Sequence, residues 1–473
     1  MLKKTFVLVL ALLLVTVGLV AAQSGNLPGS GWWSGQQIQN VGTAQTSVLF
    51  TAYNAQGQPF TCGDVKPAAP GQSVNFLTNT DCNVPAGFVG SAVVSADQPI
   101  AAIVNVVNMP SGRAAGMYRG TDGADVANSI AFPLMKNNYF GRSTTLYIQN
   151  ASTSPNTINV SVKVGNGTHT KTFNNVPANA MVLVGPADLS PVMPNNNYGS
   201  ATVTGSGSLA GAALEYESAV ALGSNLHAYT AFGPQDFAVK AYCPLIRNNY
   251  ARLNTGIQAQ NVHNAAQNIK VTYSYRVNNQ GAVLTKEVTK GPVAAGAAVT
   301  FFTPADGLPA GAVGSATVQG MGGGKIAVIV NDETFTLSPN RVAAYTCFPD
   351  AAASNKAALP LYKEFYFGDT SGIQVQNVGG VAANISVTYY PPSGGPVKFT
   401  QNNFTTGSIA TFYNVSGAGA ASGDPATLTQ TAGGVVVESN QPIVAIVNEE
   451  PGSKAGTRPA STQDAKLYEG FNQ

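Results

Sequence analysis

Hydrophobic and polar residues alternate along short segments of most of the chain. Val160, Val162 and Val164 are separated by polar residues, and Ile385 and Val387 repeat this spacing. Such alternation with a period of two predicts β-strands that bury one face. Glycine, asparagine and proline cluster between these segments and predict turns. No segment shows sustained helical periodicity, so the pattern predicts an all-β fold.

An internal repeat organises these predicted strands. One phrase occurs four times and ends each time on Gln-Asn, at Asn40, Asn150, Asn261 and Asn377, about 110 residues apart. We expect each asparagine to end a strand and bond the following turn. A more apolar phrase follows in every repeat and predicts a central strand covered on both faces.

About seven strands fit into one repeat, which is the size of an immunoglobulin-like β-sandwich. The sequence therefore predicts four tandem immunoglobulin-like domains in an elongated array. Their predicted bounds are 23–128, 129–240, 241–355 and 356–473, after a signal peptide at 1–22.

A third phrase opens repeats two to four but is missing from the first. It begins with Pro-Leu and carries a basic residue, Lys136, Arg247 or Lys363, which we expect at the domain junctions. Because the first repeat lacks this opening strand, we expect an unpaired sheet edge there. A strand from another copy of the chain could pair with this edge and join copies head to tail.

The N-terminus has the features of a secretory signal. Lys3 and Lys4 precede an apolar segment at 6–20, and small residues up to Ala22 form a cleavage site, so the mature chain is expected to start at Gln23. The alternative is an uncleaved membrane anchor. No later segment is apolar over the roughly 18 residues that a spanning helix needs, so no transmembrane segment is expected in the mature chain.

Composition narrows the range of partners. The formal net charge is +2 and only 10% of the residues are charged. This balance provides no basic surface for nucleic acid and no polybasic patch for a membrane. The apolar share of 44% excludes a disordered chain.

The cysteine count favours disulfides. An even number of cysteines in an exported chain indicates disulfide bonds. Cys62 and Cys82 fall in the first repeat and are expected to pair, while Cys243 and Cys347 flank the third repeat and could seal it. Metal ligation is the alternative, but the sequence contains no Cys-x-x-Cys pair and no suitably placed histidine.

Catalytic motifs are absent from the sequence. There is no nucleophile elbow, no zinc-protease helix, no phosphate loop and no dinucleotide fingerprint. His169, His227 and His263 lie in different parts of the repeats, and we expect them at the surface rather than in a metal site. We therefore predict that the protein is not an enzyme and has no cofactor.

Acidic residues recur directly after the predicted central strand. They are Glu215 in the second repeat, Asp332-Glu333 in the third and Glu449-Glu450 in the fourth. A pair of carboxylates in a loop could bind calcium together with backbone carbonyls. The alternative, which we favour, is a solvated loop.

Aromatic residues suggest two further features. Trp32 and Trp33 stand where the first repeat lacks its opening strand, and they form either an interaction surface or a cover for the open edge. Tyr118, Tyr229 and Tyr345 recur after the central strand. We expect these tyrosines to be buried in a closing strand.

The repeat phrases and the export signal resemble tandem immunoglobulin-like arrays of bacterial cell surfaces, such as surface-layer proteins and adhesin stalks. The resemblance is architectural and covers the whole mature chain. It implies a secreted, cell-surface structural or adhesive protein that associates with itself or with other surface components. The alternative is an array of modules that bind glycans or proteins.

Overall fold

The computed structural model describes residues 27–108, 114–217, 225–334, 341–413, 428, 430–452 and 465–473. The predicted signal peptide lies outside these residues. Among the residues described, no helix has both the length and the apolar character needed to cross a membrane. The strands are joined mostly by short turns, and the predicted all-β class is confirmed.

We call the four sequence repeats units 1 to 4. Unit 1 contains β1 (Trp32–Asn40), β2 (Thr46–Asn54), β3 (Pro59–Thr61), β4 (Lys66–Ala68), β5 (Ser73–Leu77), α1 (Thr78–Asp81), β6 (Gly90–Ala96), β7 (Ile100–Asn108) and β8 (Ala115–Arg119). Unit 2 contains β9 (Ala127–Asn137), β10 (Arg142–Asn150), β11 (Asn156–Val164), β12 (Gly167–Val176), β13 (Met181–Val184), β14 (Asn197–Glu217) and β15 (Leu226–Thr230).

Unit 3 contains β16 (Lys240–Tyr250), β17 (Leu253–Asn261), β18 (Gln267–Val277), β19 (Gln280–Val293), β20 (Ala298–Phe302), β21 (Ala312–Gly320), β22 (Ile326–Glu333), β23 (Val342–Thr346) and β24 (Phe348–Pro349). Unit 4 contains β25 (Ser354–Glu364), β26 (Asp369–Asn377), β27 (Ala383–Tyr390), β28 (Val397–Phe404), β29 (Ile409–Tyr413), β30 (Thr431–Pro451), β31 (Lys466–Glu469) and β32 (Phe471–Asn472). Short 3-10 turns lie at Pro186–Asp188, Pro234–Asp236, Met321–Gly323 and Asp350–Ala352.

Unit 2 shows how the strands are layered. The first half of the long strand β14 pairs with β11 and with the opening strand β9, which forms an outer sheet. The second half pairs with β10 and with the closing strand β15, which forms an inner sheet. Apolar side chains from both sheets, including Ile148, Val160, Val203 and Tyr229, form one buried core between them.

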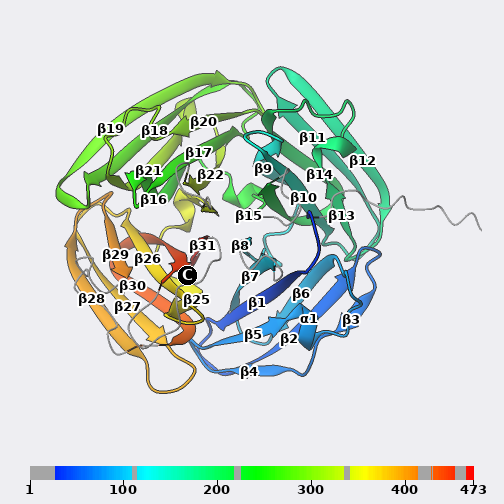
Figure 1. The fold of residues 1–473 in the computed structure, drawn as a ribbon, viewed down its shortest axis with the longest axis horizontal. Coiled ribbons are helices and arrows are strands. Elements are labelled where there is room, and N and C mark those ends of the chain that lie inside the picture. Colours follow the sequence, from blue (N-terminus) through cyan, green and yellow to red (C-terminus); the bar gives the residue numbers. More distant parts are fainter. Residues whose placement is uncertain are drawn as a thin grey trace, which may run out of the picture.

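The four units form a closed ring (Figure 1). The closing strands β8, β15, β23 and β31 meet at its centre, where each contacts its two neighbours. The expectation of an elongated array is therefore wrong. Each opening strand packs against the next unit, so the same contact repeats around the molecule. A repeated contact of this kind closes into a ring when its rotations add up to a full turn.

Equivalent hydrogen bonds join neighbouring units. In three seams a serine hydroxyl donates to a backbone carbonyl of the next unit: Ser91 to Asn179 at 2.7 Å, Ser200 to Gly296 at 2.7 Å, and Ser315 to Gly407 at 2.6 Å. In the seam between units 4 and 1, Gly434 replaces the serine. There Gln39 Nε2 donates to the carbonyl of Val435 at 3.2 Å, and Ser73 Oγ donates to that of Pro360 at 2.8 Å.

Unit 1 departs from the other three at its outer sheet. Strands β14, β21 and β30 pair on one side with an opening strand, β9, β16 or β25. In unit 1 the equivalent strand β6 pairs with β2, and no described strand lies along its other edge. The open edge expected from the sequence is present in the part of the chain that the structure describes.

Candidate functional site

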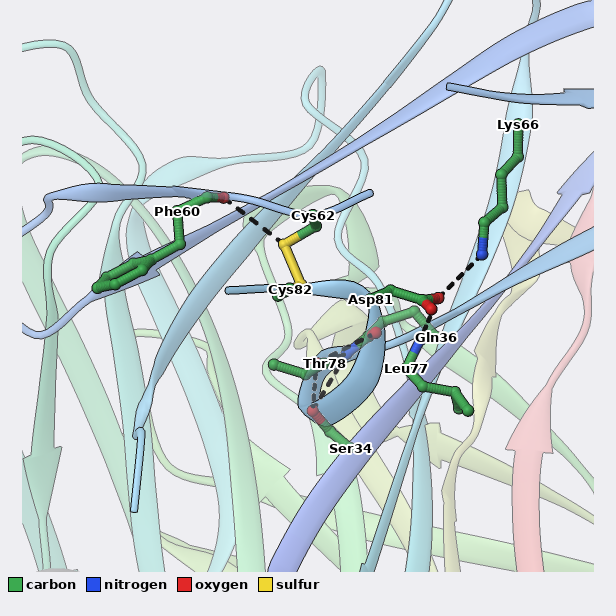
Figure 2. The surroundings of a disulfide bond; sticks show 9 residues. All are labelled: Ser34, Gln36, Phe60, Cys62, Lys66, Leu77, Thr78, Asp81 and Cys82. Atoms are coloured by element: carbon green, nitrogen blue, oxygen red, sulfur yellow. Dashed lines mark hydrogen bonds and ion pairs between the residues drawn. A yellow bond between two sulfur atoms is a disulfide. The ribbon is translucent and has the colours of Figure 1, made fainter. Parts of the chain in front are cut away.

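The cysteines form two disulfides, Cys62–Cys82 and Cys243–Cys347. Figure 2 shows the first, which joins the chain after β3 to the end of α1. Beside it, Lys66 Nζ lies 2.9 Å from Asp81 Oδ2, and the two side chains form an ion pair. The second disulfide joins the opening strand of unit 3 to the residue after its closing strand. Two disulfides are compatible with an oxidising, extracellular location.

The repeated asparagines hold the turns that follow them. The side-chain oxygen of Asn261 accepts a hydrogen bond from the N–H of His263, two residues on, and its amide group donates to the carbonyls of Ala265 and Val293. Asn40, Asn150 and Asn377 make the equivalent bonds. These side chains therefore act as local turn and strand connectors.

A buried cluster of charged side chains lies in the seam between units 2 and 3. Lys136 of β9 contacts Glu215 of β14 at 2.8 Å, and Arg142 at the start of β10 contacts Glu333 of unit 3 at 2.6 Å. His227 Nδ1 lies 2.9 Å from Glu215. The acidic residues after the central strand are therefore not in a solvated loop. Glu215 belongs to β14 and Glu333 to β22, and both are buried between two units.

The electrostatics of this cluster favour charged carboxylates. Burial alone would raise the pKa of Glu215, but the nearby charges of Lys136 and His227 outweigh it and hold the pKa below its ordinary value. The pKa of Glu333 is likewise lowered, because Lys136 and Arg142 outweigh its burial. Buried ion pairs of this kind hold their partners in one geometry and are costly to break.

The same cluster contains residue types that bind metals. Glu215, His227 and Glu333 place one potential ligand atom each within 4.8 Å of the others. However, Lys136 and Arg142 direct two positive charges at these carboxylates. They balance the two negative charges and would repel an added cation. The arrangement is therefore an ion-pair network between units.

Units 3 and 4 contain related networks. Arg247 of β16 lies 3.2 Å from Asp332 of its own unit and 3.0 Å from Glu450 of unit 4. Lys363 of β25 lies 2.8 Å from both Asp369 and Glu449, and Lys466 joins the same two carboxylates. Lys136 and Arg247 thus lie at junctions between units, as the sequence predicts, whereas the ion pairs of Lys363 among the described residues lie within unit 4.

In the seam between units 1 and 2, the equivalent position is apolar instead. Trp32 occupies the position that Arg142 has in unit 2, and it packs against an apolar cluster that contains Val106 of unit 1 and Leu214 of unit 2. The Trp32 side chain is half-buried and its Nε1 donates to the carbonyl of Pro28 at 2.8 Å. Trp32 thus packs into the seam between units 1 and 2, and the choice between its two expected roles stays a prediction. Trp33 is also half-buried.

Histidine and tyrosine placement corrects one expectation and supports another. His169 and His227 are buried, so the expected surface position is wrong for both. His169 Nδ1 lies 2.7 Å from the carbonyl oxygen of Pro191, and the ion-pair network contains His227. Tyr229 and Tyr345 are buried, as expected for closing strands.

Two phenylalanines that the sequence reasoning did not select are among the most exposed apolar residues described. Phe140 is 77% exposed and Phe367 is 57% exposed. They occupy equivalent turns between the opening strand and the next strand in units 2 and 4. Both have a positive φ, 49° and 53°, which is rare for a non-glycine residue. The sequence signal was an aromatic pair directly before a glycine, at Gly141 and Gly368.

Two small cavities lie in the described part of the chain. One of about 140 Å³ lies in the seam between units 4 and 1 and is lined by Lys356, Tyr390 and Glu438 among others. Another of about 20 Å³ lies at the centre of the ring beside Arg119 and Asp236. Pockets that enclose a drug-sized ligand are about 300–1,000 Å³. Recognition by this molecule is therefore better suited to a surface than to either cavity.

Comparison with known proteins identifies no family. No protein-family description matches the chain, and no curated protein matches it. Among solved structures, Thermotoga maritima protein 1070 is 14% identical with a TM-score of 0.19, over 25% of this chain and 95% of its own. A tetra-tandem repeat from the extending region of a large adhesion protein is 11% identical with a TM-score of 0.11, over 93% and 94% of the two chains. At these scores neither structure carries an argument about function.

Proposed function

We propose that this chain is an exported, non-catalytic protein of a bacterial cell surface that adheres to glycans through the aromatic turns of its ring. The observation that carries the proposal is the exposure of Phe140 and Phe367 at equivalent positions. Exposed apolar surface of this kind marks interaction sites. Flat aromatic rings stack against the apolar faces of sugars, and a chain with only 10% charged residues suits a neutral polymer.

The ring geometry supports two-site binding. Units 2 and 4 lie on opposite sides of the ring (Figure 1). Their aromatic turns occupy equivalent positions and therefore face the same side of the molecule. Each turn also has a second aromatic residue beside the phenylalanine, with ring centroids 4.6 Å apart in both the Tyr139–Phe140 and the Tyr366–Phe367 pair. Two sites on one rigid body strengthen binding to a repetitive surface.

The test is a binding assay on isolated bacterial cell walls and insoluble polysaccharides. The double variant Phe140→Ser/Phe367→Ser should lose most of the bound fraction while its melting temperature stays unchanged, because both side chains are exposed. Val381→Ser is the matched control, since Val381 is 62% exposed in the turn at the opposite end of β26. If the double phenylalanine variant binds as well as Val381→Ser does, the proposal is refuted.

A second candidate function is a structural subunit that associates with other copies. The free edge of β6 favours it, because unpaired strand edges accept further strands. Negative-stain electron microscopy of the chain from Gln23 would show fibres or sheets in this case. Single rings at all concentrations, unchanged when the chain is shortened to begin at Ser34, would oppose it.

A further inference from the structure

The turn between the opening strand and the next strand has the same backbone form in units 2, 3 and 4. It contains Tyr139-Phe140-Gly141 in unit 2, Tyr250-Ala251-Arg252 in unit 3 and Tyr366-Phe367-Gly368 in unit 4. The middle residues have φ angles of 49°, 50° and 53°, and the third residues have φ angles of 77°, 66° and 82°. Unit 3 therefore keeps the form of the two aromatic turns, but alanine replaces the phenylalanine and arginine replaces the glycine.

The backbone of Arg252 is unfavourable for any residue except glycine. Glycine adopts a positive φ freely because it has no Cβ atom, whereas other residues adopt it at an energetic cost. Lack of space does not explain the glycine of unit 2, since nothing lies within 4 Å of a Cβ atom added to Gly141. A side chain at this position therefore enters open space. Residues held in rarely populated φ regions cluster at functional sites.

The guanidinium group of Arg252 has no ion-pair partner among the residues that the structure describes. The residue is exposed. Arg247, five residues earlier, is buried instead and pairs with Asp332 and Glu450. Unit 3 has eight lysines and arginines against five aspartates and glutamates between residues 241 and 355, a formal net charge of +3. The N–H donors of Arg252 are therefore available to an external acceptor, and the charge of the unit favours an acidic one.

We propose, on the basis of the glycan binding proposed for this ring, that Arg252 binds an acidic substituent of the same glycan, a carboxylate or a phosphate. Unit 3 lies between units 2 and 4 in the ring (Figure 1). Because the three turns occupy equivalent positions, Arg252 faces the same side of the molecule as Phe140 and Phe367. The planar guanidinium group donates two parallel N–H bonds to the paired oxygen atoms of such a substituent. The polymer is then mostly neutral and carries acidic groups at intervals.

The test measures binding of the purified protein to chitin and cellulose, each in its neutral form, after carboxymethylation and after phosphorylation. Arg252→Gly removes the guanidinium group and gives unit 3 the glycine of the other two turns, so this variant is expected to fold. Lys325→Gln is the matched control, because it also removes one exposed positive charge from unit 3. Lys325 lies at the opposite end of β17, where its carbonyl oxygen accepts a hydrogen bond from the N–H of Val262.

We expect the unmodified protein and Lys325→Gln to bind an acidic form about threefold to tenfold more tightly than the neutral form at low salt, as for one exposed charge-assisted pair. The acidic form that binds more tightly distinguishes a carboxylate from a phosphate. High salt should remove the preference, because it screens exposed charges. Arg252→Gly should bind all forms of a polymer equally, with the affinity that the unmodified protein has for the neutral form.

Two results would overturn the role of Arg252 and leave the proposed glycan binding intact. The first is a preference for the acidic form that Arg252→Gly retains in full. The second is equal binding of the unmodified protein to the neutral and acidic forms. If the unmodified protein binds none of these polymers and no bacterial cell wall, glycan binding itself is refuted, and the role of Arg252 is refuted with it.

Discussion

The hydroxyl group of Tyr345 donates a hydrogen bond to the carbonyl oxygen of Leu245 at 2.6 Å and accepts one from its N–H at 3.1 Å. Leu245 follows Pro244, where the pairing of β16 with β21 shifts register. Because proline has no N–H and the shift interrupts the ladder, the tyrosine supplies partners for the backbone there. Tyr229 and Tyr468 make the same contacts in units 2 and 4.

Removing this hydroxyl should destabilise the protein. Tyr345→Phe leaves two buried backbone groups without their partner, and we expect the free energy of unfolding to fall by about 1–3 kcal/mol. Denaturant unfolding measures the change. Tyr118→Phe is the control, because unit 1 has no described opening strand for Tyr118 to bond. A loss as large for Tyr118→Phe would show that the effect is not specific to the opening strand.

The ion-pair network between units 2 and 3 should respond differently to single and paired substitutions. Lys136→Met removes the lysine partner of the buried Glu215 and leaves only Arg142 and His227 beside it, and we expect a loss of about 3–5 kcal/mol. Lys136→Met/Glu215→Gln removes both charges and should recover most of this loss. Thermal unfolding of both variants measures the effect. A double variant less stable than the single variant would contradict the assigned pairing.

The ring should lose stability in acid. The pKa values of Glu215, Glu333 and Glu450 lie below the ordinary glutamate value, because neighbouring cations outweigh burial. Their contribution is fully present above that ordinary value and is lost as the pH falls through the lowered values. Burial raises the pKa of Asp332, which contributes in the opposite direction.

We therefore expect the melting temperature to fall below a pH of about 4.5, near the ordinary pKa of glutamate. Thermal unfolding between pH 7 and pH 2 measures this dependence. Lys136→Met/Glu215→Gln should show a shallower decline than the unmodified chain. Parallel curves for the two proteins would contradict a role of this network in acid sensitivity.

Ring closure can be disturbed at a single glycine. A Cβ atom on Gly434 would lie 2.6 Å from both Gln39 Nε2 and the carbonyl oxygen of Gly71, across the seam between units 4 and 1. Gly434→Val should therefore open this seam and increase the radius of gyration in small-angle X-ray scattering. Gly395→Val is the control in the same unit, because nothing lies within 4 Å of its added Cβ. An unchanged radius for Gly434→Val would show that the seam adapts.

Much of the local structure could be predicted from the sequence. The alternation of Val160, Val162 and Val164 corresponds to the buried face of β11, and the Gln-Asn phrases end strands as expected. The ring could not be predicted in the same way. Closure depends on the angle between units. The contacts in the seams, such as the bond from the Ser200 hydroxyl to the backbone carbonyl of Gly296, use residues that have no distinctive sequence pattern.

The ion-pair networks were also missed, although the sequence contained a signal for them. Units that have a basic residue in the opening phrase also have acidic residues after the central strand. Unit 1 lacks the opening phrase and has Val106 and Val107 at the acidic positions. This correlation indicates contact between the two segments. The burial of His227 had no such signal, because it depends on which unit packs against unit 2.

The meeting of four closing strands at one centre has a consequence for how this molecule can change during evolution. A linear array can gain or lose a copy at its end, because each copy depends on one or two neighbours. Here every unit contacts two others, and the rotations between the four units already add up to a full turn. A duplicated or deleted copy would require all the remaining angles to change together. Variation should therefore accumulate by altering turns and individual units, as in the incomplete first unit, while the copy number stays fixed.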